Sequence, residues 1–514
     1  MTASAPEGST QLVFVLFVFY LFKIRKVPLR LKKKKKKPIF FKGVLTQQKC
    51  IATLALFCCS AVLMVLIFSS VDIWGDSEDG ITEENCSRDC RIVLAENIPD
   101  DLSLHVDGRH HIPLSVGFQS LLEQAKLSVE VVSSVWDLNA WDLEPTPGTA
   151  AQGQLLFQRL LRLKSRGVKL KIASSLTNSS ELKALAAHNA QVRFVNMTAL
   201  TKGGLHSSFW IVDRTHIYIG SAEMDWRSLS KRKELGVVVY NCSCLALDLH
   251  RVFSFYWQLH DRDYIPSIWS KRVTALYGKH EALELQLNTT PATAYLSTSP
   301  EHFCPKDRTR DLDAIHQVIQ SAKTFVFISV TDYLPLVKRS FRGTSLIREA
   351  VVLRGVKVRL LISFWKKTHP LTFNFVTSLK TLCMQLHNCS LEVSRCTFFF
   401  IIHHKEQKED FQLGLNHNKY MVTDNAVYLG THDWVGSDFA INAGVGLVVR
   451  MKDSTKDTGA TILEHIKASF ERDWRSRYAK NLQKSKDQQG KYRLLQWSKS
   501  QWETKEEKEW NNPL

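Results

Sequence analysis

The stretch HNKYMVTD, His417–Asp424, is the segment from which the fold can be inferred. It has the form His-x-Lys-x4-Asp and precedes the apolar run Ala426–Gly430, which reads as a strand. Alternate side chains of an extended segment point to the same face, so His417 and Lys419 are expected to face one site. An imidazole can attack phosphorus or carry a proton, and an ammonium can neutralise phosphate oxygens. The stretch therefore indicates phosphoryl chemistry.

A second copy of this stretch lies upstream. It is HSSFWIVD, His206–Asp213, and it runs into the apolar segment Ile217–Ser221. The frame is the same, but Ser208 stands where the lysine would be. Two copies of one motif predict two equivalent halves, each of which brings one histidine to a shared cleft.

The internal repeat extends well beyond the two motifs. In each half a strand follows a short amphipathic helix, a second helix ends at glycine before another strand, and a further strand comes after the motif. The matching segments are Ala125–Val132 with Ala322–Ser329, Arg166–Ile172 with Arg354–Leu360, and Glu234–Val239 with Ala443–Val449. Strands that alternate with helices predict an α/β fold made of two pseudo-symmetric sandwich domains, with mixed sheets flanked by helices.

The two motifs resemble the HKD motifs of the phospholipase D superfamily. The phrases KELGVVVYNCSCLALDL, residues 233–249, and NHNKYMVTD, residues 416–424, are similar to the type II membrane branch of that family. The branch contains the endolysosomal phospholipases D 3 and D 4 and an inactive member, and the missing lysine points to the inactive member. The resemblance covers residues 73–480.

The resemblance implies a mechanism without metal or cofactor. One motif histidine would attack phosphorus, and the other would protonate the leaving alkoxide and then activate water or an alcohol. Two interpretations of Asp213 and Asp424 stay open: they fix histidine tautomers by accepting an imidazole N–H, or they are turn residues ahead of the next strand. His206 also admits a second interpretation, as a packing residue on a structural strand.

Three positions depart from the family pattern. Ser208 replaces a lysine, and Glu223 and Asp433 stand where the family has asparagines. Loss of one anion-stabilising donor typically costs about 2.7–4 kcal/mol of transition-state stabilisation, and carboxylates facing a phosphate add repulsion. We therefore expect an inactive or strongly impaired protein that binds a phosphorylated ligand or a partner. The alternative is a weak phosphodiesterase that trims single-stranded nucleic acid from the 5′ end or exchanges phospholipid headgroups.

The positive charge of the chain is concentrated at its N-terminus. The formal net charge is +18, and residues 1–70 hold twelve Lys and Arg against Glu7 alone. Most of the basicity therefore says little about a nucleic-acid-binding surface. The lysine run 32–37 is expected to lie against anionic headgroups rather than to act as a nuclear signal.

Residues 50–71 contain no charged side chain and are long enough to span a bilayer as a helix. Basic residues precede this segment and four acidic residues between 72 and 79 follow it, so the positive-inside rule places the N-terminus in the cytosol. We therefore expect a single-pass type II membrane protein of the secretory or endolysosomal system, with its bulk in the lumen. The apolar run 12–22 is too short to span and stays unassigned.

The cysteines and the glycosylation sequons agree with this topology. Eight cysteines follow the membrane segment, an even number that suits disulfides in an oxidising compartment. We expect Cys86 and Cys90 to pair with Cys242 and Cys244; a zinc site is disfavoured because Cys242 and Cys244 are spaced more tightly than usual zinc ligands. Sequons occur only beyond the membrane segment, at Asn85, Asn178, Asn196, Asn241, Asn288 and Asn388.

The expected organisation has seven parts. They are a cytosolic arm (1–49), a membrane helix (50–71), a lumenal stalk (72–115), a first domain (116–262), a linker (263–294), a second domain (295–480) and a charged tail (481–514). His403 and His404, in an insertion before the second motif, are interpreted as loop residues rather than metal ligands. The expected partners are a membrane, a phosphorylated ligand (nucleic acid or phospholipid) and a second copy in a homodimer.

Overall fold

The computed structural model describes residues 55–60 and 86–481, with gaps at 100–101, 103, 105–110, 141–149, 261, 266–272, 336–344, 364, 366–367, 387–388, 397–414 and 453–460. The chain divides into two units, Met1–Ile73 and Trp74–Leu514. Among the described residues, no helix combines the length and the apolar character needed to cross a membrane. The predicted arm, most of the predicted membrane segment, the run 12–22, His403, His404, Asn85 and Asn388 lie outside the described residues.

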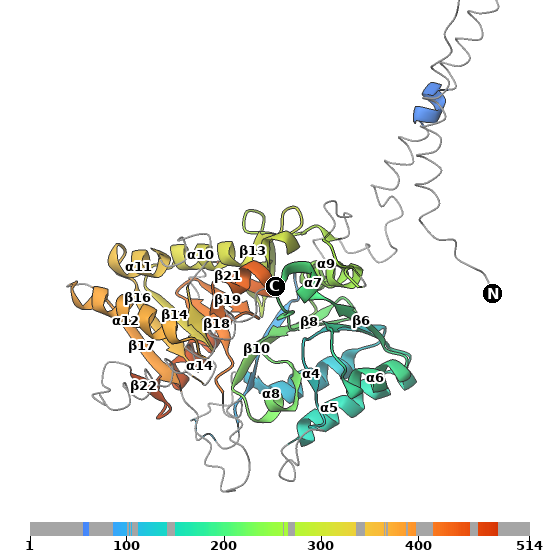
Figure 1. Cartoon of the computed structure of the whole chain (residues 1–514), viewed down its shortest axis with the longest axis horizontal. Coiled ribbons are helices and arrows are strands. Elements are labelled where there is room, and N and C mark those ends of the chain that lie inside the picture. Colours follow the sequence, from blue (N-terminus) through green and yellow to red (C-terminus); the bar gives the residue numbers. More distant parts are fainter. Residues whose placement is uncertain are drawn as a thin grey trace, which may run out of the picture. The chain divides into compact units, whose positions relative to one another are not determined.

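The second unit contains two large sheets (Figure 1). The first has eight strands in the order β2-β1-β10-β8-β7-β3-β5-β6. The strands are β1 Arg91–Asn97, β2 His111–Pro113, β3 Ser128–Val132, β5 Lys169–Ser175, β6 Gln191–Val195, β7 Phe209–Val212, β8 His216–Gly220 and β10 Glu234–Tyr240. The short strands β4 Trp136–Asp137 and β9 Met224–Asp225 pair separately. The helices are α4 Leu114–Gln124, α5 Ala151–Arg162, α6 Ser180–Ala187, α7 Met197–Thr201, α8 Trp226–Ser230 and α9 Ser243–Gln258, with a 3-10 turn at Lys164–Arg166.

The second sheet has ten strands, ordered β11-β12-β21-β19-β18-β14-β16-β17-β22 with β13 beside β12. They are β11 Leu283–Leu287, β12 Thr290–Ser299, β13 Thr309–Arg310, β14 Phe325–Val330, β16 Lys357–Ile362, β17 Leu391–Cys396, β18 Lys419–Thr423, β19 Ala426–Gly430, β21 Gly444–Met451 and β22 Ala479–Asn481. The short strands β15 Tyr333–Leu334 and β20 Trp434–Val435 pair separately. The helices are α10 Asp311–Ser321, α11 Ser345–Val352, α12 Pro370–Met384, α13 Asp438–Ile441 and α14 Ile462–Arg475, with a 3-10 turn at Glu301–Phe303.

The two sheets repeat one topology. The run β1-β10-β8-β7-β3-β5-β6 corresponds strand by strand to β12-β21-β19-β18-β14-β16-β17, and four antiparallel pairings followed by two parallel ones occur in both. Helices flank both sheets (Figure 1). The predicted α/β fold with two mixed sheets is therefore confirmed, and it is the fold expected of a phospholipase D-like protein.

One hydrophobic core joins the two halves. The largest buried cluster takes Phe209 from β7 and Phe253 from α9, together with Val422 from β18 and Phe470 from α14. This cluster therefore joins strands and helices of both halves, while two further clusters pack the sheets against α4–α5 and α10–α12. Because apolar burial is the main stabilising contribution, the shared core holds the two motif strands at a common boundary.

Two predicted boundaries were wrong. Residues 91–97, assigned to the stalk, form β1 and pair along their whole length with β10. Residues 283–294, assigned to the linker, form β11 and the start of β12. In both cases the segment pairs with a strand that lies much later in the chain, β1 with β10 and β12 with β21, and buries side chains against that sheet. Neither segment carries the internal repeat that guided the boundaries.

The predicted cysteine couples are joined, as Cys86–Cys244 and Cys90–Cys242, with Cα–Cα distances of 5.2 and 4.7 Å. A third bridge, Cys383–Cys389, was not predicted because the two residues are only six apart and follow no motif. The first two bridges tie the segment ahead of β1 to the start of α9. Such disulfides indicate a protein of the secretory pathway.

Loss of both long bridges, Cys86–Cys244 and Cys90–Cys242, should destabilise the folded state by about 2–5 kcal/mol, because a cross-link over a long loop removes much entropy from the unfolded chain. The two bridges close nearly the same loop, so either one alone retains most of this effect. We expect the variant with alanine at all four of these cysteines to have a correspondingly lower denaturant midpoint as the full chain. The matched control is Cys383→Ala/Cys389→Ala, whose bridge spans six residues and whose loss should cost less. Equal losses from the two variants would contradict this prediction.

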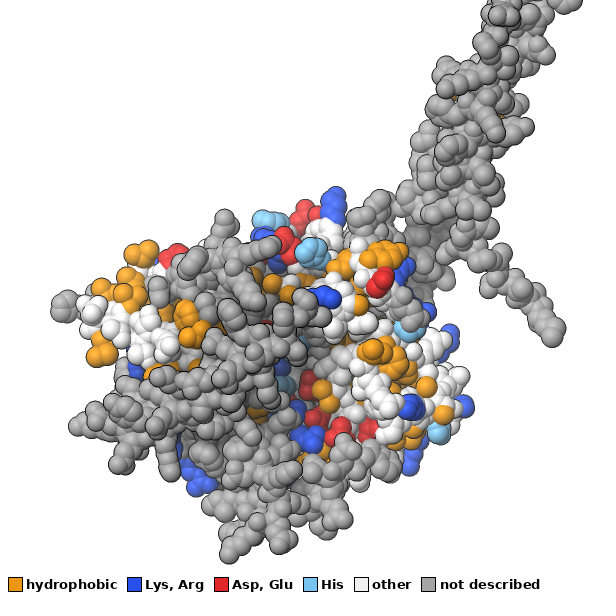
Figure 2. All heavy atoms as spheres, in the orientation of Figure 1, with side chains coloured by type: hydrophobic (Ala, Val, Ile, Leu, Met, Phe, Trp, Pro, Cys, Tyr) orange, Lys and Arg blue, Asp and Glu red, His pale blue; other side chains and the backbone are white. Residues whose placement is uncertain are grey.

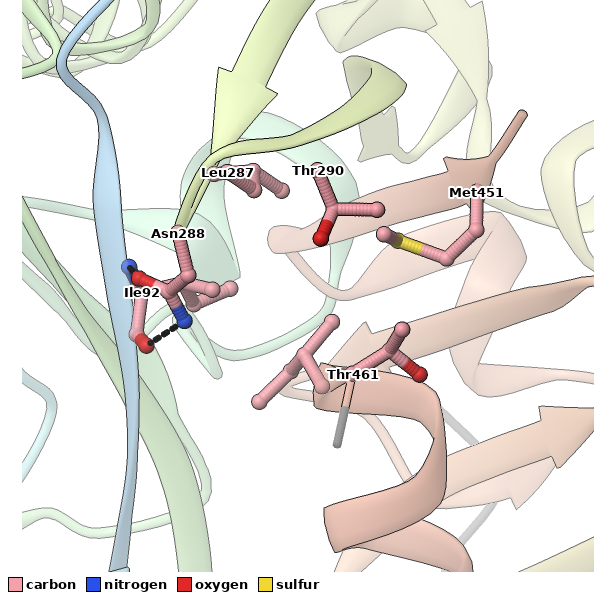
Figure 3. A pocket seen from close by; sticks show the side chains of 7 residues that line it. Ile92, Leu287, Asn288, Thr290, Met451 and Thr461 are labelled. Carbon is pink, nitrogen blue, oxygen red and sulfur yellow. Dashed lines mark hydrogen bonds between the residues drawn. The ribbon is translucent and has the colours of Figure 1, made fainter. Parts of the chain in front are cut away.

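The described sequons differ in how their amides are used. Asn178, Asn196 and Asn241 are exposed. Asn288 lies at a turn between β11 and β12, where its side chain accepts from the Ile92 N–H at 3.0 Å and donates to the Ile92 carbonyl at 2.8 Å. Figure 3 shows the hydrogen bond from Asn288 to Ile92. The two residues line a cavity of about 150 Å³. Asn288 therefore clamps β1 in place, a role that the sequon pattern alone did not suggest.

Candidate functional site

The two motif histidines lie where the halves meet, each just ahead of its motif strand. The His206 N–H donates to the carbonyl of Ala443 at 2.7 Å, and the His417 N–H donates to the carbonyl of Lys233 at 2.8 Å. Ala443 immediately precedes β21, and Lys233 immediately precedes β10. Each half thus anchors the backbone of the other half's histidine. The structure brings the two predicted histidines to one boundary.

His417 is held on both sides of its ring. Its Nδ1 lies 3.0 Å from both carboxylate oxygens of Glu234, and its Nε2 lies 3.2 Å from the Nζ of Lys419. An ammonium only donates, so this contact requires a lone pair on Nε2 and places the ring proton on Nδ1, facing Glu234. His417 and Lys419 therefore share one face of the extended motif, as the sequence predicted.

Glu234 is itself fixed. It is fully buried at the start of β10, and it accepts from the hydroxyls of Ser221 at 2.5 Å and Ser228 at 2.8 Å. Burial alone would raise the pKa of Glu234, but the His417 ring first, and then the charge of Arg232 and the hydroxyl of Ser221, lower it below its usual value. The carboxylate that orients the second motif's histidine thus comes from the first half of the chain.

His206 has no such support. Among the described residues no side chain forms a hydrogen bond with its ring, which lies 5.6 Å from the ring of His432 between centroids. His206 is partly exposed to solvent, which argues against a role as a core packing residue. The remaining part of the ring is buried, and this burial, together with the positive charge of Lys419, lowers the pKa of His206 below its usual value of 6.5.

The missing support can be located by strand register. Gly236 of β10 pairs with Gly220, and Gly446 of β21 pairs with Gly430 in the same way. Counting back two residues, Gly444 occupies the position equivalent to Glu234. Glycine offers no carboxylate to a histidine.

The ring of His432 occupies the space beside Gly444. A Cβ added at Gly444 would lie 2.0 Å from the Nε2 of His432. That ring is buried, and its Nε2 lies 2.7 Å from the hydroxyl of Ser299, which in turn donates to Asp311. Burial and the neighbouring His206 lower the pKa of His432 well below its usual value. His432 therefore fills the region in which a side chain from position 444 would reach His206.

Ser208 supplies no cation to the first motif. It is buried, and its hydroxyl donates to the carbonyl of Ala222 at 2.5 Å. The neighbouring Ser207 points to the other side of the strand, where its hydroxyl lies 2.8 Å from that of Tyr256. The motif backbone is thus kept while the ammonium is lost.

The two acidic substitutions have different surroundings. Glu223 accepts from Ser134 at 3.0 Å and lies 3.5 Å from the guanidinium of Arg232, which offsets its charge. Asp433 instead caps a turn, and its Oδ1 accepts from the N–H groups of Thr331 and Asp332 at 3.1 and 3.2 Å. The expectation of two uncompensated carboxylates thus needs correction at Glu223.

Two further carboxyl groups lie near Asp433. Asp332 accepts from Trp365 at 2.8 Å and from Thr368 at 2.9 Å. Burial first and the charge of Asp433 second raise the pKa of Asp332 to about 6. The same two causes raise the pKa of Asp438 to about 6. The acidic character of this side of the site is therefore greater than the motifs alone suggested.

Asp213 and Asp424 are structural rather than catalytic. The carboxylate of Asp213 accepts from the N–H groups of residues 126, 127 and 128, and that of Asp424 accepts from those of residues 323, 324 and 325. Each aspartate stands at the far end of a motif strand from its histidine. The tautomer role considered for them is therefore wrong, and the turn interpretation describes them correctly.

Sequence reasoning missed Glu234, Arg232, His432, Asp332 and Asp438. The sequence did contain a signal for Glu234. The matched segments that begin at Glu234 and at Ala443 differ because only the segment beginning at Glu234 contains a glutamate. Arg232, His432 and Asp332 come from connecting segments that the motifs do not cover, and Asp438 is the first residue of α13. Over the described part of the chain, no group of three His, Cys, Asp or Glu residues is arranged to hold a metal ion. Figure 2 shows acidic, basic and histidine side chains gathered in a recess near the middle of the face of the molecule that it draws.

The chain is similar to several known proteins. Residues 107–403 match the family described as "PLD3/4, PLD-like domain". The chain is 51% identical over 454 residues to inactive phospholipase D5 of Mus musculus, covering 86% of this chain and 83% of that one. It is 38% identical over 434 residues to 5'-3' exonuclease PLD3 of Xenopus laevis, covering 82% and 87%. The structure of phosphatidylserine synthase from Haemophilus influenzae aligns with a TM-score of 0.47 at 11% identity, covering 72% of this chain and 85% of that one.

Proposed function

Because this chain belongs to the phospholipase D superfamily, in the family of PLD3/4-like domains, we propose that it is a catalytically impaired member that binds a phosphorylated ligand. His417 and Lys419 form the anion-binding part of the site. The name of inactive phospholipase D5 of Mus musculus, a relative at 51% identity, supports the same conclusion.

The asymmetry between the two motif histidines is the observation on which this proposal depends. His417 has a carboxylate at Nδ1 and an ammonium at Nε2, whereas His206 has neither among the residues that the structure describes. A two-step transfer through a histidine adduct needs one imidazole as nucleophile and the other as acid and base, so both must be oriented. One oriented imidazole is enough for a binding pocket but not for rapid turnover.

Charge around the site supports the same proposal. Lys419 is the motif cation that remains, and its charge acts on Asp332 and Asp438, two carboxyl groups that also interact with Asp433. A phosphodiester that approaches His417 is attracted by this ammonium and repelled by the three carboxylates, none of which has an ion-pair partner like Arg232 among the described residues. In a partly dry cleft such repulsion is large.

A weak phosphodiesterase remains the second candidate. Both imidazoles are present, and the relative from Xenopus laevis at 38% identity is named a 5'-3' exonuclease. Single-stranded nucleic acid and phospholipid both carry the phosphodiester that this site would take. The two candidates differ in turnover rather than in ligand chemistry.

The N-terminal sequence supports a type II arrangement in the membrane. The uncharged segment 50–71, with basic residues before it and acidic residues after it, would anchor the chain with residues 72–514 in the lumen. The disulfides at the start of the second unit fit an oxidising lumen. The phosphorylated ligand would therefore be met in the secretory or endolysosomal lumen.

The proposal is tested with the full chain in detergent and dimethyl phosphate as the probe. We expect calorimetric binding that weakens with added salt, because the attraction is electrostatic. Lys419→Met should abolish it, and Lys452→Met, at an exposed pair with Glu284, should leave it unchanged. Turnover of a chromogenic phosphodiester and of single-stranded DNA should be at least about 10²-fold below that of an active relative. Comparable turnover would overturn the proposal and establish the second candidate.

Binding of dimethyl phosphate should strengthen as the pH falls from 7.5 to 5. This probe keeps one negative charge throughout. Asp332 and Asp438, with pKa values of about 6, are charged at the upper pH and largely neutral at the lower one, so repulsion decreases as the pH falls. A change of about tenfold corresponds to 1.4 kcal/mol, a plausible Coulomb energy for such charges. Asp332→Asn should flatten the pH profile, and an unchanged profile in that variant would contradict this explanation.

A further inference from the structure

We propose that the first half of the chain carries a binding surface for sulfated glycosaminoglycans, at the end of the first sheet away from the motif histidines. The surface consists of five exposed cationic side chains, here called the basic ridge: Lys126, Arg162, Lys164, Arg166 and Lys169. The extended motif segment from His206 to Asp213, whose end lies beside the ridge, spans roughly 20 Å. The ridge is therefore separate from the candidate functional site, and the inference does not depend on the proposed function.

Two neighbouring turns build the basic ridge. Lys126 lies between α4 and β3, and the other four cations lie from the end of α5 to the start of β5. The guanidinium of Arg166 donates to the carbonyl of Ala125 at 2.6 Å, and the backbone N–H of Lys169 donates to the carbonyl of Leu127 at 2.9 Å. These hydrogen bonds fix the two turns against each other. The cations that the turns carry therefore share one surface.

The charge of the ridge is not neutralised by neighbouring carboxylates. In the part of the chain that the structure describes, four of the five ridge cations have no ion-pair partner: Lys126, Arg162, Lys164 and Lys169. The nearby carboxylate of Glu123 lies 3.3 Å from Arg159 instead. The carboxylate of Asp213 accepts from the backbone N–H groups of residues 126, 127 and 128. Like charges held on one surface repel each other, and a bound polyanion would relieve that repulsion.

The second half repeats this part of the fold and shows which charges the scaffold uses. By strand register, Lys169 corresponds to Lys357, which lies 3.7 Å from the carboxylate of Glu392. Three residues earlier in each half, Arg166 corresponds to Arg354. Both guanidinium groups donate to backbone carbonyls at the ends of helices, those of α4 and of α10 respectively. This arginine therefore belongs to the scaffold of both halves.

The scaffold does not require the other ridge cations. By the same count, Arg162 and Lys164 correspond to Ala350 and Val352, which carry no charge. The second half thus forms the same helix end, turn and strand with fewer cations, one of which is paired with a carboxylate. A charge that the fold omits from one copy of the repeat is free to serve binding in the other copy.

Two features favour a sulfated glycosaminoglycan over other polyanions. The disulfides indicate the secretory pathway, where sulfated polysaccharides occur, whereas the anionic lipids that attract basic segments lie on the cytoplasmic leaflet. Nucleic-acid surfaces that accept single strands combine cations with aromatic rings on which bases stack. The ridge and the exposed Leu127 between its turns provide no aromatic ring. A linear chain of sulfate groups needs only a set of cations, which the ridge supplies.

The test measures binding of a heparin oligosaccharide of defined length to the full chain in detergent at several salt concentrations. The lysine run 32–37 is replaced by glutamine in the parent and in every variant, so that it adds no background. The ridge variant is Lys126→Gln/Arg162→Gln/Lys164→Gln/Lys169→Gln. We expect it to bind at least about tenfold more weakly and with a smaller dependence on salt, because fewer counterions are released. Its urea midpoint should not fall, because none of the four side chains has an ion pair to lose among the described residues.

The matched control removes four cations from the second half, as Lys323→Gln/Lys357→Gln/Lys452→Gln/Lys480→Gln, and should keep most of the heparin affinity. Equal losses in the two variants would reduce the effect to net charge and overturn the inference. Unchanged heparin affinity in the ridge variant would overturn it as well. If single-stranded DNA or phosphatidylserine vesicles bind more tightly than heparin and are released by the ridge substitutions, the choice of partner is wrong. Binding of dimethyl phosphate, which the ridge substitutions should leave unchanged, reports on the proposed function alone.

Discussion

Ser208→Lys combined with Asp433→Asn should raise phosphodiester turnover by about 10²–10³-fold over the parent chain. Restoring one anion-stabilising donor is worth about 2.7–4 kcal/mol of transition-state stabilisation, which corresponds to that factor. Removing the Asp433 charge should add to the effect, because in the described part of the chain no cation lies beside this carboxylate as Arg232 lies beside Glu223. Steady-state hydrolysis of a chromogenic phosphodiester by the full chain measures the gain.

The controls for this repair use the same site. Adding His417→Asn should abolish the gain, because the covalent step needs that imidazole. Adding Glu223→Asn should increase turnover little further, because it removes a carboxylate whose charge Arg232 already offsets. A folded double variant that remains inert would show that charge is not the main defect and that the absent carboxylate at position 444 is.

Lys233→Met should destabilise the folded chain by about 3–5 kcal/mol. Lys233 is completely buried, and its ammonium contacts the buried carboxylate of Glu96 and lies 3.5 Å from that of Asp473. Arg472 completes the group, at 2.6 Å from Glu96 and 2.8 Å from Asp473. Breaking a buried ion pair leaves an uncompensated charge, whose cost is of this size. Urea unfolding of the full chain measures the loss, and Lys452→Met, at an exposed pair, should change stability by less than about 1 kcal/mol.

The same four charges predict how stability depends on pH. Burial raises the pKa of Glu96, but Lys233 and Arg472 outweigh it and lower the value from 4.5 to about 2. A carboxyl with a lowered pKa contributes stability above its unfolded value, and this contribution is lost as the pH falls from about 4.5 towards 2. Lys233→Met should raise the pKa of Glu96 and move that loss to higher pH. An acid-unfolding curve unchanged by the substitution would contradict the assignment.

This buried group also supports the site. Glu96 belongs to β1, Lys233 precedes β10, and Arg472 and Asp473 belong to α14, so the four residues connect the two halves. The carbonyl of Lys233 accepts from the backbone N–H of His417, and the next residue, Glu234, holds its ring. Lys233→Met should therefore weaken the binding of dimethyl phosphate as well as stability.

Local patterns in the sequence were sufficient for the two-sheet architecture, the paired motifs and the cysteine couples. The period-two spacing of His417 and Lys419 placed them on one face because an extended backbone alternates its side chains. The loss of a lysine at Ser208 was visible in the sequence, because the equivalent position of the second motif is Lys419. Each of these conclusions depends on neighbours along the chain or on comparison of one half with the other.

Only the tertiary structure decided which residues act on the two histidines. Glu234 lies 183 residues before His417, and Lys233, Arg232 and His432 likewise act across turns and between halves. The tertiary structure also showed that Asp213 and Asp424 have a structural role: they lie at strand ends and accept hydrogen bonds from backbone N–H groups. Contacts between distant segments arise from the packing of two sheets on a shared core, and no local periodicity records them. The sequence by itself therefore determined the family fold and the missing lysine, while the missing carboxylate beside His206 followed from the register of strands that meet only in the folded chain.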